Sequence, residues 1–102
     1  MKIFVTRNIP EQGLAVLRKE FTVEVNLLDR VLRKEEIIAG VKGKDGLLCL
    51  LTDQIDADVI NAEPNLKMIA SYAVGYDNID IKFATERDIP VFDTLDVLTE
   101  AP

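Results

Sequence analysis

The residues with the clearest chemical potential lie between Leu66 and Asp80, in the sequence LKMIASYAVGYDNID. A short apolar run ends here in small and turn-forming residues, which is typical of a buried strand that leads into a functional loop. Gly75 can adopt positive φ, and its missing Cβ lets a ligand approach the backbone. The N–H groups of Val74, Gly75 and Tyr76 are therefore predicted to form a small concavity for a carboxylate or carbonyl oxygen. The alternative is that Gly75 only permits a turn.

Other kinds of site are less well supported by the sequence. Asp77, Asn78 and Asp80 are expected to cap a helix, because carboxylates near a helix N-terminus are stabilising and the spacing lacks the pattern of a calcium loop. No metal site is therefore predicted. The glycines match neither G-x-G-x-x-G nor a P-loop. Ser71 is the only serine, and the chain contains no histidine to activate it.

Composition limits the class of protein. The chain has 102 residues, of which 48% are hydrophobic, and its formal net charge is -6. These values predict one domain over residues 1–102 and argue against binding to nucleic acid or anionic lipid. Cys49 lies in the apolar run 47–51, so it is expected to be a buried thiol in a reducing compartment. No signal peptide and no membrane span are expected, which predicts a cytoplasmic protein.

Apolar runs alternate with amphipathic segments along the chain, which predicts a three-layer α/β fold. Right-handed crossovers then give a five-stranded parallel sheet of flavodoxin-like order 2-1-3-4-5 with helices on both faces. Ligands bind beyond the carboxyl ends of such strands, where the segments 6–10, 51–54 and 73–78 should converge. The expected strands cover residues 3–5, 21–25, 46–51, 66–70 and 89–92, and the expected helices cover residues 10–20, 33–41, 57–62 and 79–84.

Several details of these elements follow from single residues. Asn8 and Asp56 are predicted N-caps, and Pro10 suits an early helical position. Gly40 and Gly43 are expected to punctuate the second helix. The first helix is expected to bury one stripe, formed by Leu14, Ala15, Leu17 and Phe21. Residues 94–102 have no place left in the sheet and are expected to form an exposed tail or the start of a longer helix.

A family resemblance becomes visible in the C-terminal third. The sequence LKMIASYAVGYDNIDIKFATERDIPVFDTLDVLTEA strongly resembles the N-terminal segment of D-2-hydroxyacid dehydrogenases, closest to the glyoxylate/hydroxypyruvate reductase branch. In that family a strand is followed by an AVGYDNID loop, a helix that ends in ERGIPV, and an NTPxVLT segment. The similarity extends back to Met1. It implies the flavodoxin-like substrate-binding domain of the family, in agreement with the alternation of elements.

The resemblance also implies roles for individual residues. Val74 and Gly75 would present backbone amides to the carboxylate of a 2-keto acid, with Leu51 and Tyr76 lining the cleft. Thr99 would lie on the crossover to the cofactor domain, near the nicotinamide. The family's arginine, its glutamate and histidine pair and its NAD(P) fingerprint belong downstream. We therefore expect no catalytic residue and no cofactor in this chain, and at most weak binding of a 2-keto acid.

Departures from the family pattern lie near the C-terminus. Asp88 occupies the place of a glycine that would need positive φ, FDTL replaces TNTP at 92–95, and Pro102 stands where the crossover helix should continue. Together they favour an excised and engineered domain. A second hypothesis follows, in which the former interdomain face binds a second copy or a designed protein partner. This interface would contain Phe92, Leu95, Val97 and Leu98. The alternative is a truncated domain with a frayed tail.

Overall fold

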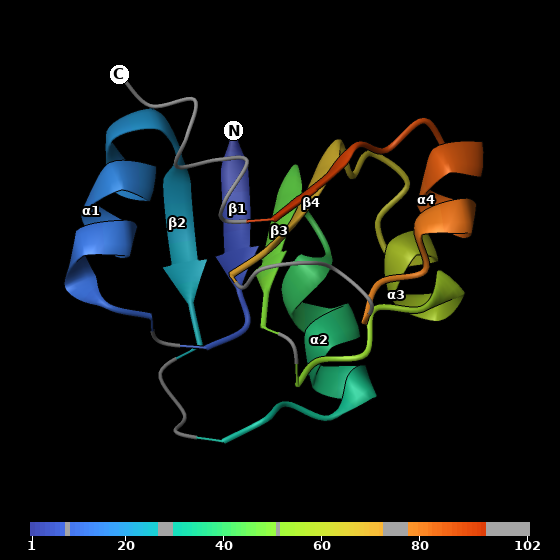
Figure 1. The fold of residues 1–102 in the computed structure, drawn as a ribbon, viewed down its shortest axis with the longest axis horizontal. Coiled ribbons are helices and arrows are strands. Elements are labelled where there is room, and N and C mark those ends of the chain that lie inside the picture. Colours follow the sequence, from blue (N-terminus) through green and yellow to red (C-terminus); the bar gives the residue numbers. More distant parts are fainter. Residues whose placement is uncertain (8, 27–29, 51, 73–77, 94–102) are drawn as a thin grey trace.

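The computed structural model describes residues 1–7, 9–26, 30–50, 52–72 and 78–93. Strands and helices alternate through these residues, as the sequence pattern predicts (Figure 1). The strands are β1 (Lys2–Val5), β2 (Thr22–Val25), β3 (Gly46–Cys49), β4 (Met68–Ser71) and β5 (Val91–Asp93). The helices are α1 (Glu11–Glu20), α2 (Lys34–Val41), α3 (Ala57–Asn61) and α4 (Ile81–Glu86).

The five strands form one sheet with the order β2-β1-β3-β4-β5, and every neighbouring pair is parallel. This confirms the predicted α/β class and strand order. Pro90 precedes β5, which lies at the edge of the sheet, where a missing backbone N–H costs no ladder hydrogen bond. The order reverses between β1 and β3, and this is the place where parallel α/β sheets bind ligands.

The two faces of the sheet have separate cores, because successive side chains of a strand point to opposite faces. Phe4, Leu47 and Ile69 pack with the inner residues of α2, α3 and α4 in the larger cluster. Ile3, Leu48 and Ala70 form the smaller cluster under α1, which contributes only Leu14 as a fully buried helix residue. Figure 1 shows α1 separated from the other three helices by the strands. Of the helices in the described residues, three therefore cover one face and α1 covers the other.

Side-chain caps start two of the helices. Asp56 accepts hydrogen bonds from the backbone N–H groups of Asp58 and Val59 at the start of α3, at 3.1 and 3.3 Å. Asp80 accepts one from Phe83 at the start of α4, at 3.1 Å. Both caps were predicted, and each satisfies backbone donors that the helix itself leaves free.

Asp88 ends α4 in the left-handed conformation that its position in the family pattern requires. Its φ is +58°, and its N–H donates to Thr85 O while the next N–H, of Ile89, donates to Ala84 O. This pair of bonds is the Schellman motif, whose left-handed position usually holds glycine. Aspartate tolerates this conformation better than most residues with a Cβ.

Three local predictions were wrong. Ala15 is exposed, because α1 rests on the sheet through a narrow stripe around Leu14. The same helix begins at Glu11, so Pro10 is its N-cap, lies outside the helical residues and takes the place predicted for Asn8, which is outside the described residues. Gly40 lies inside α2 and does not end it; the following glycine, Gly43, has φ +79° and lies just after the helix. Among the described residues, no helix has the length and apolar character needed to cross a membrane.

Candidate functional site

A group of buried polar residues lies at the carboxyl edge of β1, β3 and β4. Thr6 follows β1, Asp53 follows β3 and Ser71 ends β4, and all three are buried. Buried polar side chains cost free energy unless they are hydrogen-bonded. Their gathering at the place where the strand order reverses makes this edge the candidate site.

Asp53 holds the turn that follows β3. Its Oδ2 accepts hydrogen bonds from Thr6 Oγ1 at 2.5 Å and from the backbone N–H of Leu50 at 2.9 Å. The N–H of Asp53 donates to Leu50 O at 3.0 Å, which closes the turn between residues 50 and 53. One carboxylate thus ties the end of β1 to both sides of the turn after β3.

Asn78 connects this turn to the segment that leads into α4. Its Nδ2 donates to Leu50 O at 2.9 Å and to Asp53 O at 2.8 Å. The backbone contributes two further bonds, from Ile55 N–H to Asn78 O and from Asp80 N–H to Ile55 O. Asn78 was predicted to cap a helix, and this was wrong, since its amide bridges two loops. Asp77 lies outside the described residues.

Cys49 lies at the end of β3 next to this bridge and is fully buried. Burial is the main cause that raises the pKa of its thiol to about 12; the charge of Asp53 adds to the rise, while hydrogen bonding by Asn78 and Ser71 opposes it. Asn78 Nδ2 lies 3.6 Å from the Cys49 Sγ. The thiol therefore stays protonated near neutral pH, as expected for a buried cysteine with no nucleophilic role.

The residues predicted to touch a ligand lie outside the described part of the chain, and so do most of the predicted interface residues. Phe92 is the exception. It lies in β5, is half-buried and packs against the smaller core cluster. The described residues on either side of the predicted site do converge, because Asn78 joins the segment after β4 to the turn after β3. The residues outside are Leu51, Val74, Gly75, Tyr76, Leu95, Val97, Leu98 and Thr99.

Sequence reasoning missed the roles of Thr6, Asp53 and Asn78. All three lie in the segments 6–10, 51–54 and 73–78 that were expected to converge, but no role was predicted for the side chains of Thr6 and Asp53, and Asn78 was predicted to be a cap. A polar side chain directly after a buried apolar strand is the one signal that could have drawn attention to Asp53. Its partners lie far away in the sequence, so the signal alone does not identify them.

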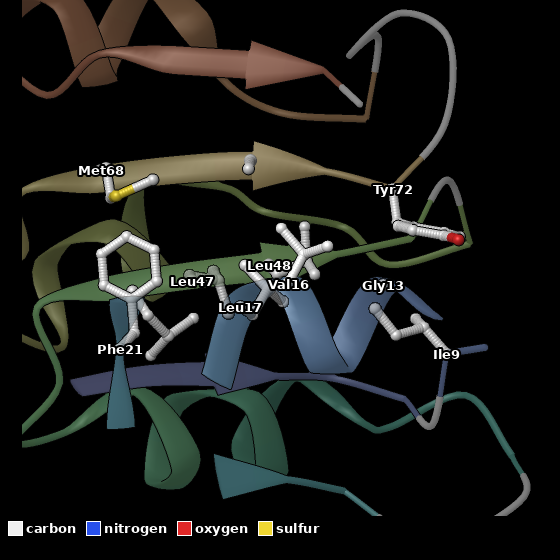
Figure 2. Close-up of a pocket in the computed structure, with 11 residues that line it drawn as sticks. Ile9, Gly13, Val16, Leu17, Phe21, Leu47, Leu48, Met68 and Tyr72 are labelled. Atoms are coloured by element: carbon white, nitrogen blue, oxygen red, sulfur yellow. The ribbon is translucent and has the colours of Figure 1, made fainter. Parts of the chain in front are cut away.

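An apolar groove of about 170 Å³ lies between α1 and the β3–β4 part of the sheet. Figure 2 shows Phe21, Leu17 and Met68 at one end of it and Tyr72, Ile9 and Gly13 at the other. Val16 also lines the groove and is 49% exposed. Among the helices that the structure describes, α1 is the one that packs on this face of the sheet.

The chain offers little that fits a nucleotide cofactor or a metal. Its five glycines, at positions 13, 40, 43, 46 and 75, do not form the G-x-G-x-x-G sequence that cradles a pyrophosphate. Within the described ranges, no three side chains from histidine, cysteine, aspartate and glutamate are grouped to hold a metal ion. At the carboxyl edge, the side chains of Asp53 and Asn78 hold backbone in place.

Comparison with known proteins identifies the family. The family model for the catalytic domain of D-isomer specific 2-hydroxyacid dehydrogenases matches residues 3–102. The chain belongs to this family. The match continues through the positions between Asp88 and Pro102 that depart from the expected pattern.

Relatives of this dehydrogenase family are similar over nearly the whole chain. A glyoxylate reductase of Thermococcus kodakarensis is 46% identical over 100 residues, and one of Thermofilum pendens is 50% identical over 101 residues. Each alignment covers 98% of this chain and 30% of the relative. The chain therefore spans about a third of the length of the curated relatives it matches.

Solved structures of the family have the same fold. An NAD⁺-bound 3-phosphoglycerate dehydrogenase of Entamoeba histolytica aligns with a TM-score of 0.77 at 30% identity, covering 92% of this chain and 32% of that one. A glyoxylate/hydroxypyruvate reductase of Sinorhizobium meliloti, in complex with NADP and malonate, aligns with a TM-score of 0.67 at 26% identity. The alignment covers 97% of this chain and 30% of that chain.

Proposed function

We propose that this chain is the substrate-binding part of a glyoxylate reductase-like D-2-hydroxyacid dehydrogenase, and that its loop amides at Val74 and Gly75 bind the carboxylate of a small 2-keto acid. The observation that carries the proposal is the Asn78 bridge, which holds the segment after β4 against the turn that contains Leu51. The described residues that flank the two predicted walls are thereby joined at one edge of the sheet, which supports the proposal.

The relatives support the type of ligand. Two are named glyoxylate reductases, and the Sinorhizobium structure holds malonate, a small dicarboxylate. Binding to this chain alone is expected to be weak, because ligands are held best in clefts that bury most of their surface. In a longer enzyme that binds NAD(P), Thr99 is proposed to lie near the nicotinamide. A cytoplasmic location remains a prediction.

The first prediction concerns carboxylate binding. Titration of the chain with oxalate is expected to shift the amide resonances of Val74 and Gly75, with a dissociation constant in the millimolar range. The amide of Gly43 is an internal control, since it donates a hydrogen bond to the Glu63 carboxylate at the opposite edge of the sheet. Sodium chloride at equal ionic strength should leave all three resonances in place. No movement at Val74 and Gly75 up to tens of millimolar oxalate would remove the proposal.

The second prediction concerns turnover. The purified chain is expected not to oxidise NADH or NADPH with glyoxylate, because it contains neither histidine nor a dinucleotide fingerprint. The absorbance of the reduced cofactor, followed beside a sample without protein, measures this. A full-length glyoxylate reductase serves as the positive control. Steady turnover by this chain would contradict the assignment to substrate binding alone.

A second candidate function, an engineered interaction module, is favoured by the apolar groove under α1. Parallel sheets are normally covered on both faces. Among the described helices, α2, α3 and α4 pack on one face, whereas α1 alone packs on the other. Exposed apolar surface of this kind often marks a contact region. Phe92, the described member of the predicted interface, packs against the same cluster. The proposed occupant is a second copy of the chain, since a twofold axis would cover both grooves at once.

The third prediction tests this self-association. Val16→Asp places a charge at the rim of the groove. It is expected to convert the proposed dimer to a monomer, as measured by sedimentation over micromolar concentrations. Ala15→Asp is the matched control, because Ala15 is exposed on the same helix and is not among the groove residues. A wild-type chain that remains strictly monomeric would rule out this candidate, and equal effects of both substitutions would contradict the role of the groove.

A further inference from the structure

The hydrogen bonds around Asn78 and Asp53 form a clamp between two segments that are distant in sequence. The Asn78 side chain reaches the carbonyl oxygens of Leu50 and Asp53, which are 28 and 25 residues away. The Asp53 carboxylate reaches Thr6, 47 residues away on another strand. The ends of β1 and β3 and the entry to α4 are thereby joined through two side chains.

The clamp holds described residues that are neighbours in sequence of the residues that the proposed function needs. Leu51 stands in the sequence between Leu50 and Asp53, whose backbone groups bond to the clamp side chains. Val74 and Gly75 lie just before Asn78 in the chain. Fixing Asn78 against the turn therefore fixes one end of the loop that carries the proposed amides.

Both side chains of the clamp have unusual chemical features. The side-chain amide of Asn78 donates to two carbonyl oxygens. An aspartate of nearly the same shape would lack these two N–H donors. Asp53 is 1% exposed, although buried carboxylates are rare without a cation partner. Its Oδ1 and the Oδ1 of Asn78 are buried without a hydrogen-bond partner among the described residues. Each buried polar atom without a partner calls for an explanation.

We propose that Asn78 and Asp53 are positioning residues for the proposed 2-keto acid site, because they hold the turn closed by Leu50 and Asp53 against the segment that leads into α4. This inference rests on the proposed function, because the purpose of the clamp is to hold the two walls of that site. Neither side chain is assigned a contact with the ligand. Their effect on binding acts through the backbone that they hold.

The first arm of the test needs no ligand. Amide hydrogen exchange is measured at Asp53 and Ile55, whose N–H groups donate to Leu50 O and Asn78 O. Asn78→Ala and Asn78→Asp are each expected to speed exchange at both amides about tenfold, because each removes the two donors. Val59→Ala is the control, since it destabilises the core between α3 and the sheet without touching the clamp. After correction for global stability, this control should leave the two rates unchanged.

The second arm measures oxalate affinity by amide shifts. Asn78→Ala is expected to raise the dissociation constant about tenfold, and Val59→Ala to leave it unchanged at temperatures where both variants are folded. Asp53→Asn keeps one side-chain oxygen that can accept from Thr6 and Leu50, so it should resemble the wild type in both arms, whereas Asp53→Ala should resemble Asn78→Ala. This rescue keeps the test valid if one of the alanine variants does not fold.

The outcomes separate the two proposals. If wild type fails to bind oxalate, the proposed function falls, and the clamp is judged by hydrogen exchange alone. Wild-type exchange rates in Asn78→Ala and Asn78→Asp would overturn the clamp whatever the ligand result. Faster exchange with an unchanged oxalate affinity would overturn its positioning role. An equal loss of affinity in Val59→Ala would also overturn that role, because general destabilisation would then explain the effect.

Discussion

Replacing Ile69 by alanine is expected to lower the free energy of unfolding by about 2–5 kcal/mol. Ile69 is 0% exposed in the middle of β4, and it packs in the larger core cluster between the strands and the helices α2, α3 and α4. The substitution removes buried methyl and methylene groups and leaves a cavity, because β4 is held by β3 on one side and β5 on the other and cannot collapse into the space.

The size of this effect matters because a domain of this length has a total stability of only about 5–15 kcal/mol. Urea unfolding followed by far-UV circular dichroism measures it as a lower midpoint with an unchanged slope. Ile81→Ala is the matched control: it makes the same chemical change at a residue that is 36% exposed at the start of α4. The control is expected to cost less than about 1 kcal/mol. Similar losses in both variants would show that the larger cluster is not the main core.

The fold was predictable from the sequence because its causes are mostly local. The continuous apolar run at 46–49 indicates a strand covered on both faces, and the alternation of strands with helices leaves few topologies once crossovers are right-handed. The caps at Asp56 and Asp80 were predictable for the same reason, since each carboxylate bonds to backbone within three residues.

The features that sequence did not predict depend on contacts between distant segments. Asn78 follows a loop and precedes a helix, so local reasoning makes it a cap; its actual partners belong to a turn that precedes it by at least 25 residues. Ala15 lies in the predicted apolar stripe but is exposed, because α1 contacts the sheet through a narrow stripe around Leu14. Periodicity gives the face of a helix but not how much of that face is in contact.

Gly40 is the other position where a distant contact decides the outcome, and Gly40→Ala is expected to destabilise the fold by about 1–3 kcal/mol. Two effects oppose each other. Alanine favours a helix interior over glycine by about 1 kcal/mol. However, a Cβ at position 40 would overlap the ring of Phe4, with Cε1 only 2.7 Å away and Cζ nearer still. Phe4 is buried in β1, so its ring cannot swing into solvent, and overlap is expected to outweigh helix propensity.

A double-mutant cycle with Phe4→Leu separates overlap from other causes, because leucine lacks the ring atoms that meet the new Cβ. The loss of stability in the double variant is expected to be smaller than the sum of the losses in the two single variants, by about 1 kcal/mol or more. Gly43→Ala is the control: it lies at φ +79° with no atom within 4 Å of a new Cβ, so its cost is backbone strain alone. That cost should not change when Phe4 is replaced. A coupling energy near zero between positions 4 and 40 would mean that α2 shifts on the sheet to accept the methyl group. The close approach of Gly40 to Phe4 would then not determine the position of the helix against β1.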